Sequence, residues 1–198
     1  MRFLACVVLL TSIVAAGCTG ASSTHKNTDS QAYDPPSYAK KIAIYSDGHP
    51  FFLQPISLST ATEHARKKGY SIASNRDMEL VKRELMNAAN RDRIRNPDAT
   101  YVSKFQNIDA ILLIEIAECN VFKHQSGKDS LDSMTVTARL VDVQRALVVW
   151  SDDYTVSNNN ILMLPVNILA ILFTGNDIKY TKICTNGVLN SMPKATTF

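Results

Sequence analysis

Apolar runs, alternating stretches and helical spacings follow one another along this chain, a pattern typical of strands that alternate with short helices. The first half predicts, in order, a strand over 41–46, a helix over 57–68, a strand over 70–74, a helix that begins at Asn75, a short helix from Asp98 to Phe105 and a strand over 109–118. Strands that alternate with helices favour parallel pairing through crossover connections.

Local signals suggest where these helices begin and end. Ser57 or Ser59 is the expected cap of the first helix, and Gly69 is placed to end it. Asn75 is the expected cap of the second helix. That helix carries apolar residues at the three-to-four spacing of a buried stripe: Met78, Val81, Leu85 and Ala88.

After Cys119 the pattern becomes that of antiparallel strands. A polar loop with Gly127 at its bend is expected over 124–130, and strands over 134–142 and 147–156 flank a tight turn at 143–145. Such a meander keeps one face on the core and the other toward solvent. The sequence therefore predicts an α/β fold with a mixed sheet packed with helices. The first half of that sheet is a parallel βαβ arrangement, and the second half is an antiparallel meander.

Trp150, the only tryptophan, lies on the last strand of this meander. Counting in twos places Ala146 and Val148 on its face of the strand, and Leu147 and Val149 on the other face. Both faces are apolar, which suits a strand that is covered on both sides. We therefore expect Trp150 to be largely buried.

Residues 161–173 are apolar on every side of a helix except at Asn167, but they are too few to span a bilayer. Two interpretations stay open: a helix buried under the sheet, or a surface that a partner or the membrane covers. We expect one face of the segment to pack on the sheet and the other, the partner surface, to meet a partner or the membrane. The sheet face comprises Leu164, Ile168 and Ile171, and the partner surface comprises Val166, Leu169 and Phe173.

A closing amphipathic helix is expected over 177–192. Its inward residues are Ile178, Ile183, Val188 and Leu189.

The first 18 residues have the order of a secretory signal. Arg2 precedes an apolar run, and small residues from Ala15 to Gly17 lead directly to Cys18. This order is the pattern of a bacterial lipoprotein, in which the signal is cut before Cys18 and Cys18 receives the lipid. The alternatives are an ordinary signal peptide in which Cys18 is incidental, or an uncleaved anchor.

The residues after Cys18 are polar and lack hydrophobic periodicity, so they predict a flexible tether. Thr19, where an aspartate would signal retention, favours the outer membrane. We expect a signal peptide over 1–17, a lipidated tether over 18–38 and a single periplasmic α/β domain over 39–198. The lipid holds the chain at the outer membrane, with the domain in the periplasm.

Composition and charge describe an ordinary globular protein, with 45% hydrophobic and 20% charged residues among 198. The net charge of +3 is too small and too scattered to favour nucleic acid. Cys6 leaves with the signal and Cys18 carries the lipid, so Cys119 and Cys184 remain. These two either form a disulfide in an oxidising periplasm or stay as half-buried free thiols.

The sequence contains no recognisable catalytic or metal-binding pattern. It has no glycine-rich phosphate loop, no nucleophile elbow, and no cysteine or histidine pair at metal spacing. Its four histidines lie far apart along the chain: His25, His49, His64 and His124. Glu115 and Glu118 point to opposite faces of one strand and cannot act as a carboxylate pair. We therefore expect no enzyme activity, no cofactor and no metal.

Several of these segments resemble an uncharacterised family of bacterial lipoproteins. The resemblance rests on the alternating pattern over 109–118, on Ala-Arg-Leu-Val-Asp over 138–142, on Trp150-Ser151 and on Gly69-Tyr70. Relatives of that family include CsgG-like curli-secretion lipoproteins and penicillin-binding-protein activators. The resemblance implies a fold like the N-terminal domain of TolB, with no catalytic residues. The family commonly has glycine at the hairpin turn, where this chain has Arg145-Ala146.

These observations lead to three hypotheses about function. The favoured one is a non-catalytic protein-interaction module in envelope assembly or secretion, with an envelope protein or a second copy of the chain as partner. An activator that docks on a peptidoglycan synthase is the second. A tether of about 20 residues reaches at most about 70 Å, which is short for crossing to the inner membrane. The third is a module that binds a small envelope ligand in an apolar pocket.

Overall fold

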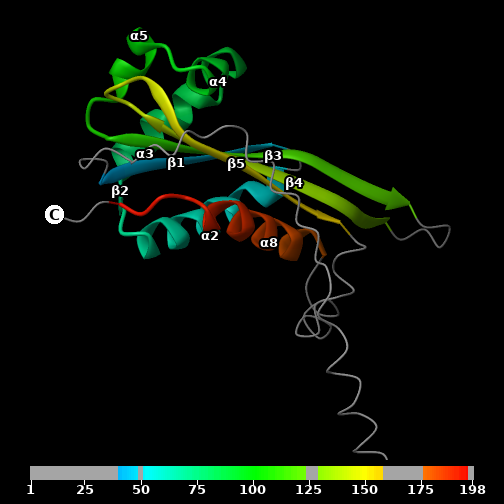
Figure 1. Cartoon of the computed structure of the whole chain (residues 1–198). Coiled ribbons are helices and arrows are strands. Elements are labelled where there is room, and N and C mark those ends of the chain that lie inside the picture. Colours follow the sequence, from blue (N-terminus) through cyan, green and yellow to red (C-terminus); the bar gives the residue numbers. More distant parts are fainter. Residues whose placement is uncertain (1–39, 49–50, 124–128, 158–175, 196–198) are drawn as a thin grey trace, which may run out of the picture.

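A five-stranded sheet with helices on both faces makes up the part of the chain that the computed structural model describes (Figure 1). The described residues are 40–48, 51–123, 129–157 and 176–195. Their elements, in chain order, are β1 (Lys41–Gly48), the 3-10 helix η1 (Phe51–Leu53), α2 (Gln54–Lys67), β2 (Ser71–Ile72), α3 (Asn75–Leu85), α4 (Ala88–Arg95), α5 (Ala99–Val102), the 3-10 helix η2 (Ser103–Phe105), β3 (Ala110–Lys123), β4 (Asp129–Asp142), β5 (Leu147–Ser157) and α8 (Asn176–Asn190).

The strands lie in the order β2-β1-β3-β4-β5. Strand β1 pairs in parallel with both β2 and β3, whereas β4 is antiparallel to both of its neighbours. Helix α2 leads from β1 to β2, and α3 to α5 lead from β2 to β3. The predicted mixed sheet, parallel in its first half and a meander in its second, is therefore confirmed.

Helix α2 begins at Gln54, earlier than the sequence suggests, and neither Ser57 nor Ser59 caps it. The 3-10 turn η1 leads directly into the helix, and Pro55 lies in its first turn. A proline is tolerated there because the first amide groups of a helix need no acceptor within it. Ser57 is instead fully buried and receives a hydrogen bond from the Thr185 hydroxyl at 3.3 Å. Gly69 follows the helix with a φ of +92°, as predicted.

The long helix expected after Asn75 is two helices. Ser74, rather than Asn75, caps α3, and its hydroxyl accepts the Asp77 amide at 3.2 Å. Asn87 then caps α4, since its side chain accepts the Ala89 amide at 2.9 Å. An asparagine that satisfies a helix start competes with continuing the previous helix. Val81 and Leu85 are buried as predicted, whereas Ala88 begins the new helix and is exposed.

The hairpin of β3 and β4 is longer than the sequence pattern indicates. Strand β3 continues to Lys123, and residues 129 and 130, expected in a loop, belong to β4. Gly127 lies outside the described residues. In the turn after β4, Ala146 takes a positive φ of 52° and the Asp142 carboxylate accepts the Arg145 amide at 2.9 Å. The predicted pairing is confirmed, with alanine in a conformation that favours glycine.

Trp150 is buried as predicted, with 7% of its surface exposed. The assignment of its neighbours by counting in twos is wrong, because the register shifts between Leu140 and Val141. Leu140 pairs with Trp150 and Val141 with Val148, so Val149 is the extra residue of a bulge. Val149 and Trp150 therefore both join one core, and Val148 is 37% exposed.

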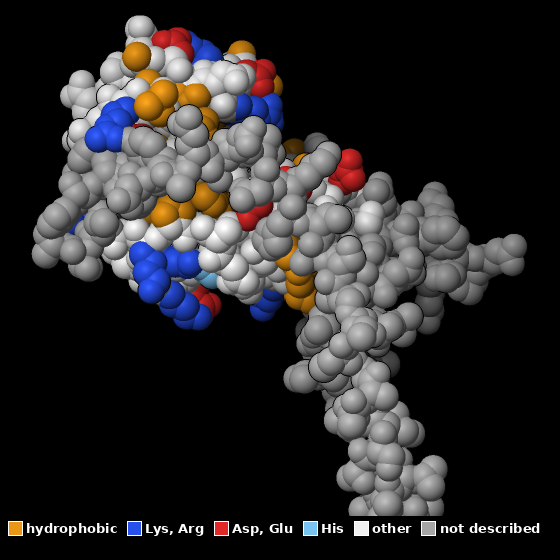
Figure 2. Space-filling view, in the orientation of Figure 1, with side chains coloured by type: hydrophobic (Ala, Val, Ile, Leu, Met, Phe, Trp, Pro, Cys, Tyr) orange, Lys and Arg blue, Asp and Glu red, His pale blue; other side chains and the backbone are white. Residues whose placement is uncertain are grey.

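The sheet separates two hydrophobic cores. Helices α2 and α8 cover one face, and α3, α4 and α5 cover the other (Figure 1). Tyr101 and Phe105 pack edge to face in the second core. In the orientation of Figure 2, hydrophobic side chains are visible between the two helical layers, with charged ones mainly on their outer sides. Within the described residues, no helix is both long and apolar enough to cross a membrane.

Helix α8 confirms the predicted closing helix. Val188 and Leu189 are fully buried and Ile183 is partly buried, whereas Ile178 is 37% exposed, contrary to expectation. Ile178 lies in the first turn of α8, which begins at Asn176. The apolar segment 161–173 lies outside the described residues.

Candidate functional site

A cleft opens beside the carboxyl-terminal half of β1, where the sheet lacks a neighbouring strand among those described. Strand β2 pairs only with Lys41 and Ile42, whereas β3 follows β1 as far as Gly48. The cleft has a volume of about 670 Å³, which lies within the range of small-molecule sites. It lies between α2 and α3, at the carboxyl end of a parallel strand, where open α/β sheets commonly bind ligands.

The direction of the main-chain groups along this edge follows from the hydrogen bonds of Lys41 and Ile42 at the start of β1. The carbonyl of Ile42 accepts the Ala73 amide beside β2, whereas the carbonyl of Lys41 accepts the Asp109 amide beside β3. Because these groups alternate in direction along a strand, Ile44, Ser46 and Gly48 direct theirs away from β3 and toward the cleft.

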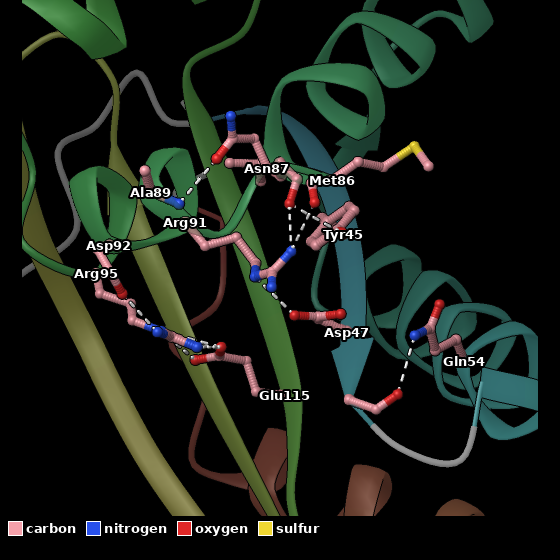
Figure 3. A network of polar contacts seen from close by, with 12 residues as sticks. Tyr45, Asp47, Gln54, Met86, Asn87, Ala89, Arg91, Asp92, Arg95 and Glu115 are labelled. Carbon is pink, nitrogen blue, oxygen red and sulfur yellow. Dashed lines mark hydrogen bonds and ion pairs between the residues drawn. The ribbon is translucent and has the colours of Figure 1, made fainter.

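Side chains cover both ends of this free edge. The Ile44 amide donates to the Met78 sulfur at 3.3 Å. At the other end, the Gln54 side chain donates to the Gly48 carbonyl at 3.0 Å (Figure 3). Ser46 lies between them and lines the cleft. It is 7% exposed, and its buried hydroxyl has no hydrogen-bond partner. A buried polar atom without a partner is unusual in a folded protein.

Gly48 ends β1 in a conformation that no other residue adopts easily. Its φ is +113°, and a Cβ there would lie 2.6 Å from the Ile116 carbonyl oxygen. The chain can therefore leave β1 close against β3, which brings η1 and the start of α2 to the mouth of the cleft.

The walls of the cleft are mainly apolar. Pro55 and Leu58 of α2 line one wall. Met78 of α3 and Met86, which directly follows α3, line the other, and Phe51 lies at the mouth. Phe51 is 64% exposed and Met86 is 68% exposed, so two large apolar side chains stand at the rim. Exposed apolar surface beside a groove is typical of binding sites, and methionine adapts readily to different partners.

An ion pair closes the inner end of the cleft. Arg91 of α4 lies with its Nε atom 2.8 Å from an Asp47 carboxylate oxygen at the end of β1 (Figure 3). The same guanidinium donates to the carbonyls of Leu85 and Met86 at 2.9 and 3.1 Å. Tyr45 also donates to the Leu85 carbonyl at 3.1 Å, and burial raises the pKa of its hydroxyl. These bonds fix the end of α3 and hence the position of Met86.

A second ionic group lies deeper in the same layer. Glu115 of β3 accepts hydrogen bonds from Arg95, which also pairs with Asp92 (Figure 3). Glu115 accepts a further hydrogen bond from Arg139 at 2.8 Å. The bonds to Glu115 raise the pKa of Arg95 above its ordinary value. Both arginines next to Glu115 are partnered, so this group holds α4 on the sheet rather than offering a free charge to a ligand.

The lining of the cleft is poorly suited to catalysis. It contains neither histidine nor cysteine, and its acidic and basic residues form pairs with one another. His64 lies away from it on α2, where burial lowers the pKa of the imidazole. In the described part of the chain, no group of three potential metal ligands is found. The cleft can bind through apolar contact and main-chain hydrogen bonds.

Of the site residues singled out from the sequence, Cys119 and Cys184 are described, and neither lines this cleft. Cys18, Val166, Leu169 and Phe173 all lie outside the described residues. Sequence reasoning missed Phe51, Met86 and Ser46. The consecutive aromatic residues Phe51 and Phe52, directly after a strand and a proline, were the one signal that could have drawn attention to the site.

Cys119 and Cys184 are not joined by a disulfide in the structure. Cys119 lies opposite Met134 in the hairpin, and the buried Cys184 thiol donates to the Met134 carbonyl at 3.4 Å. Burial raises the pKa of Cys184 to about 12, so this thiol is protonated at neutral pH. The disulfide stays a prediction. Alkylation of denatured, non-reduced protein tests it, because two alkylated thiols would contradict a bridge.

The fold and the cleft define a mixed α/β module with a groove at a sheet edge. No family model and no curated protein matches the chain. Among solved structures, it is similar to the PelC dodecamer from Paraburkholderia phytofirmans, with 16% identity, coverage of 77% of this chain and 86% of that chain, and a TM-score of 0.45.

Two further solved structures are similar to this chain. Lipoprotein GNA1162 from Neisseria meningitidis is 19% identical, with coverage of 67% of this chain and 95% of that chain and a TM-score of 0.45. TolB from Acinetobacter baumannii is 17% identical, with coverage of 73% and 28% and a TM-score of 0.35. At these values the similarity concerns the chain trace and says nothing about the cleft.

Proposed function

We propose that this chain is an outer-membrane lipoprotein whose α/β domain binds other envelope proteins without catalysing a reaction. The signal-like start that ends at Cys18 supports the anchor and the location. The cleft beside β1 supports binding, and this observation carries the proposal. Its apolar walls, exposed rim and internally paired charges suit contact with another protein rather than chemistry on a substrate.

The anchor is tested by replacing Cys18. Cys18→Ala should abolish incorporation of labelled palmitate and release the protein from the membrane fraction, because the lipid provides the membrane affinity. Ser22→Ala, a neutral change in the tether, is the matched control and should label normally. Unchanged labelling of Cys18→Ala would exclude the lipoprotein interpretation.

Binding through the cleft is tested by photo-crosslinking in intact cells. A benzophenone amino acid placed at Phe51 should capture an envelope protein, since this exposed side chain stands at the rim. The same reporter at Leu147, half exposed at the other end of the sheet, is the control. Equal capture at both positions, or none at Phe51, would contradict a binding role for the cleft.

The partner surface predicted from Val166, Leu169 and Phe173 needs its own test. Leu169→Asp should leave the domain folded and weaken association if this segment contacts a partner. A charge inside a fully buried segment would instead unfold a domain of ordinary stability. Circular dichroism together with co-purification distinguishes these outcomes.

A small envelope ligand is a second candidate, favoured by the size of the cleft. Its volume of ≈ 670 Å³ lies within the range of small-molecule sites, and its apolar walls surround a few polar groups. Native mass spectrometry of protein released gently from envelopes tests this candidate. A bound small molecule that Phe51→Asp removes would favour it over protein binding.

A further inference from the structure

We infer that the partner of the cleft is an extended, uncharged polypeptide segment of another protein, which adds as a strand to the free edge of β1. This inference rests on the proposed protein-binding function and specifies how the partner is recognised. An exposed sheet edge recognises an extended peptide through main-chain hydrogen bonds, while flanking pockets select its side chains.

The edge supplies main-chain groups in the positions that a strand needs. Ile44, Ser46 and Gly48 direct their main-chain groups into the cleft, as the bonds of Lys41 and Ile42 establish. The Ile44 amide is held only by the Met78 sulfur, which is a weak acceptor. An incoming carbonyl oxygen is a stronger acceptor and would displace that sulfur.

Ser46 provides an independent sign that this edge is incomplete. It is more than nine-tenths buried, it lines the cleft, and its hydroxyl has no partner. Leaving a buried polar atom unpaired destabilises a folded protein. A polar main chain that arrives beside Ser46 offers the groups that are missing there.

The charges of the cleft define the chemistry of the occupant. The four charged residues that line it, Asp47, Glu79, Lys82 and Arg91, have a formal sum of zero. Asp47 pairs with Arg91 at 2.8 Å, and Glu79 approaches Lys82 at 3.8 Å. No unpaired charge calls for a counter-charge, so an uncharged segment is electrostatically complementary.

The two walls fit the alternation of side chains along a strand. Successive side chains of an added strand point to opposite faces of the sheet. One set would meet Pro55 and Leu58 on α2, and the other would meet Met78 and Met86 on the α3 side. Apolar side chains at consecutive positions therefore suit the cleft on both sides.

The experiment uses the full-length chain in detergent micelles and two synthetic probes. The first probe is the capped pentapeptide Val-Thr-Val-Thr-Val. The second is the same peptide with alternate amides N-methylated, which removes its hydrogen-bond donors but keeps its side chains. Hydrogen exchange measured by mass spectrometry reports separately on residues 43–48 and on residues 147–157 at the opposite edge.

The first probe should slow exchange over 43–48 by about tenfold at saturation and leave 147–157 unchanged, because new bonds form only at β1. The N-methylated probe should have no such effect. Met78→Leu keeps the apolar wall and frees the Ile44 amide, so it should strengthen binding of the first probe about three- to tenfold.

Equal binding of both probes would overturn strand addition, and so would a Met78→Leu variant that binds the first probe no more tightly. In either case, the capture of a protein at Phe51 would still uphold the proposed function. Capture of only a small molecule, a lipid or a second copy at Phe51 would overturn both the inference and the proposed partner. Protection at 147–157 equal to that at 43–48 would show non-specific edge pairing and would also overturn the inference.

Discussion

The described sheet has two free edges, and they are built in opposite ways. The edge of β5 runs over eleven residues, Leu147–Ser157, without a further strand among those described. The free part of β1 is shorter and lies in a cleft between two helices. The long edge carries Asp152 and Asp153, whereas the short one carries the uncharged Ser46 at its centre and, next to it, Asp47 in an ion pair with Arg91.

Acidic residues defend the β5 edge against pairing. The Asp152 carboxylate receives a hydrogen bond from the Ser191 hydroxyl, and it accepts the Asp153 amide at 2.9 Å. That amide is thereby occupied, and charged side chains on an edge strand disfavour pairing with another chain. Of the two edges, the β1 edge is the one that is open to a specific partner, and the difference yields four predictions.

The largest effect is expected where β5 contributes to the core. Trp150→Ala should lower the free energy of unfolding by about 3–5 kcal/mol, because a large buried ring leaves a cavity. Leu147 on the same strand is half exposed, so Leu147→Ala should change the free energy of unfolding by about 0.5 kcal/mol or less. Urea unfolding followed by circular dichroism measures both, and similar midpoints for the two variants would contradict the structure.

A smaller loss is expected at the end of β1. Gly48→Ala should destabilise the domain by about 1–3 kcal/mol, since φ is +113° and the new Cβ meets the main chain of Ile116 at 2.6 Å. Gly20→Ala in the tether is the control. Thermal unfolding provides the measurement, and an unchanged midpoint would mean that β1 does not end in this conformation.

Ser46 on β1 and Asp152 on β5 are almost equally buried, so substitutions at these two positions compare the edges directly. Asp152→Ala should cost about 1–3 kcal/mol, because it removes the buried carboxylate that accepts the Ser191 hydroxyl and the Asp153 amide. Ser46→Ala should leave the free energy of unfolding unchanged or raise it by up to about 1 kcal/mol, since its hydroxyl has no partner to lose. Chemical unfolding of both variants tests this, and a larger loss for Ser46→Ala would refute the assignment of its hydroxyl.

The smallest change in stability is expected at the rim of the cleft. Phe51→Ser should shift the free energy of unfolding by less than about 0.5 kcal/mol, because Phe51 is largely exposed. It should nevertheless reduce partner capture, which is measured with a benzophenone reporter at Met86. Normal capture in a folded Phe51→Ser variant would remove Phe51 from the binding surface.

Local patterns were enough to predict the strands and their pairing. The apolar run over 109–118 and the alternation over 134–142 correspond to β3 and β4, because a strand that is buried on one or both faces shows this in its own residues. The helix boundaries were less predictable. Ser74 and Asn87 cap helices only because the chain turns at those points, and a neighbouring asparagine or serine could have served as well.

The candidate site could not be predicted in this way. Its lining comes from β1, η1, α2, α3 and α4, and no segment of the sequence contains more than part of it. The short length of β2, which leaves β1 uncovered, follows from how the chain turns into α3 at Ser74. The bulge at Val149 arises from a shift in the pairing of β5 with β4. The alternation of residues within β5 alone cannot reveal such a shift.

The sequence by itself determined the order of strands and helices, the mixed sheet and the signal-like start, since each depends on residues that are neighbours along the chain. Only the tertiary structure decided which sheet edge stays open, which polar groups lack partners and which apolar side chains remain exposed. Those properties depend on contacts between residues as far apart as Asp47 and Arg91. Such contacts form when helices dock on a sheet, and no local periodicity records them.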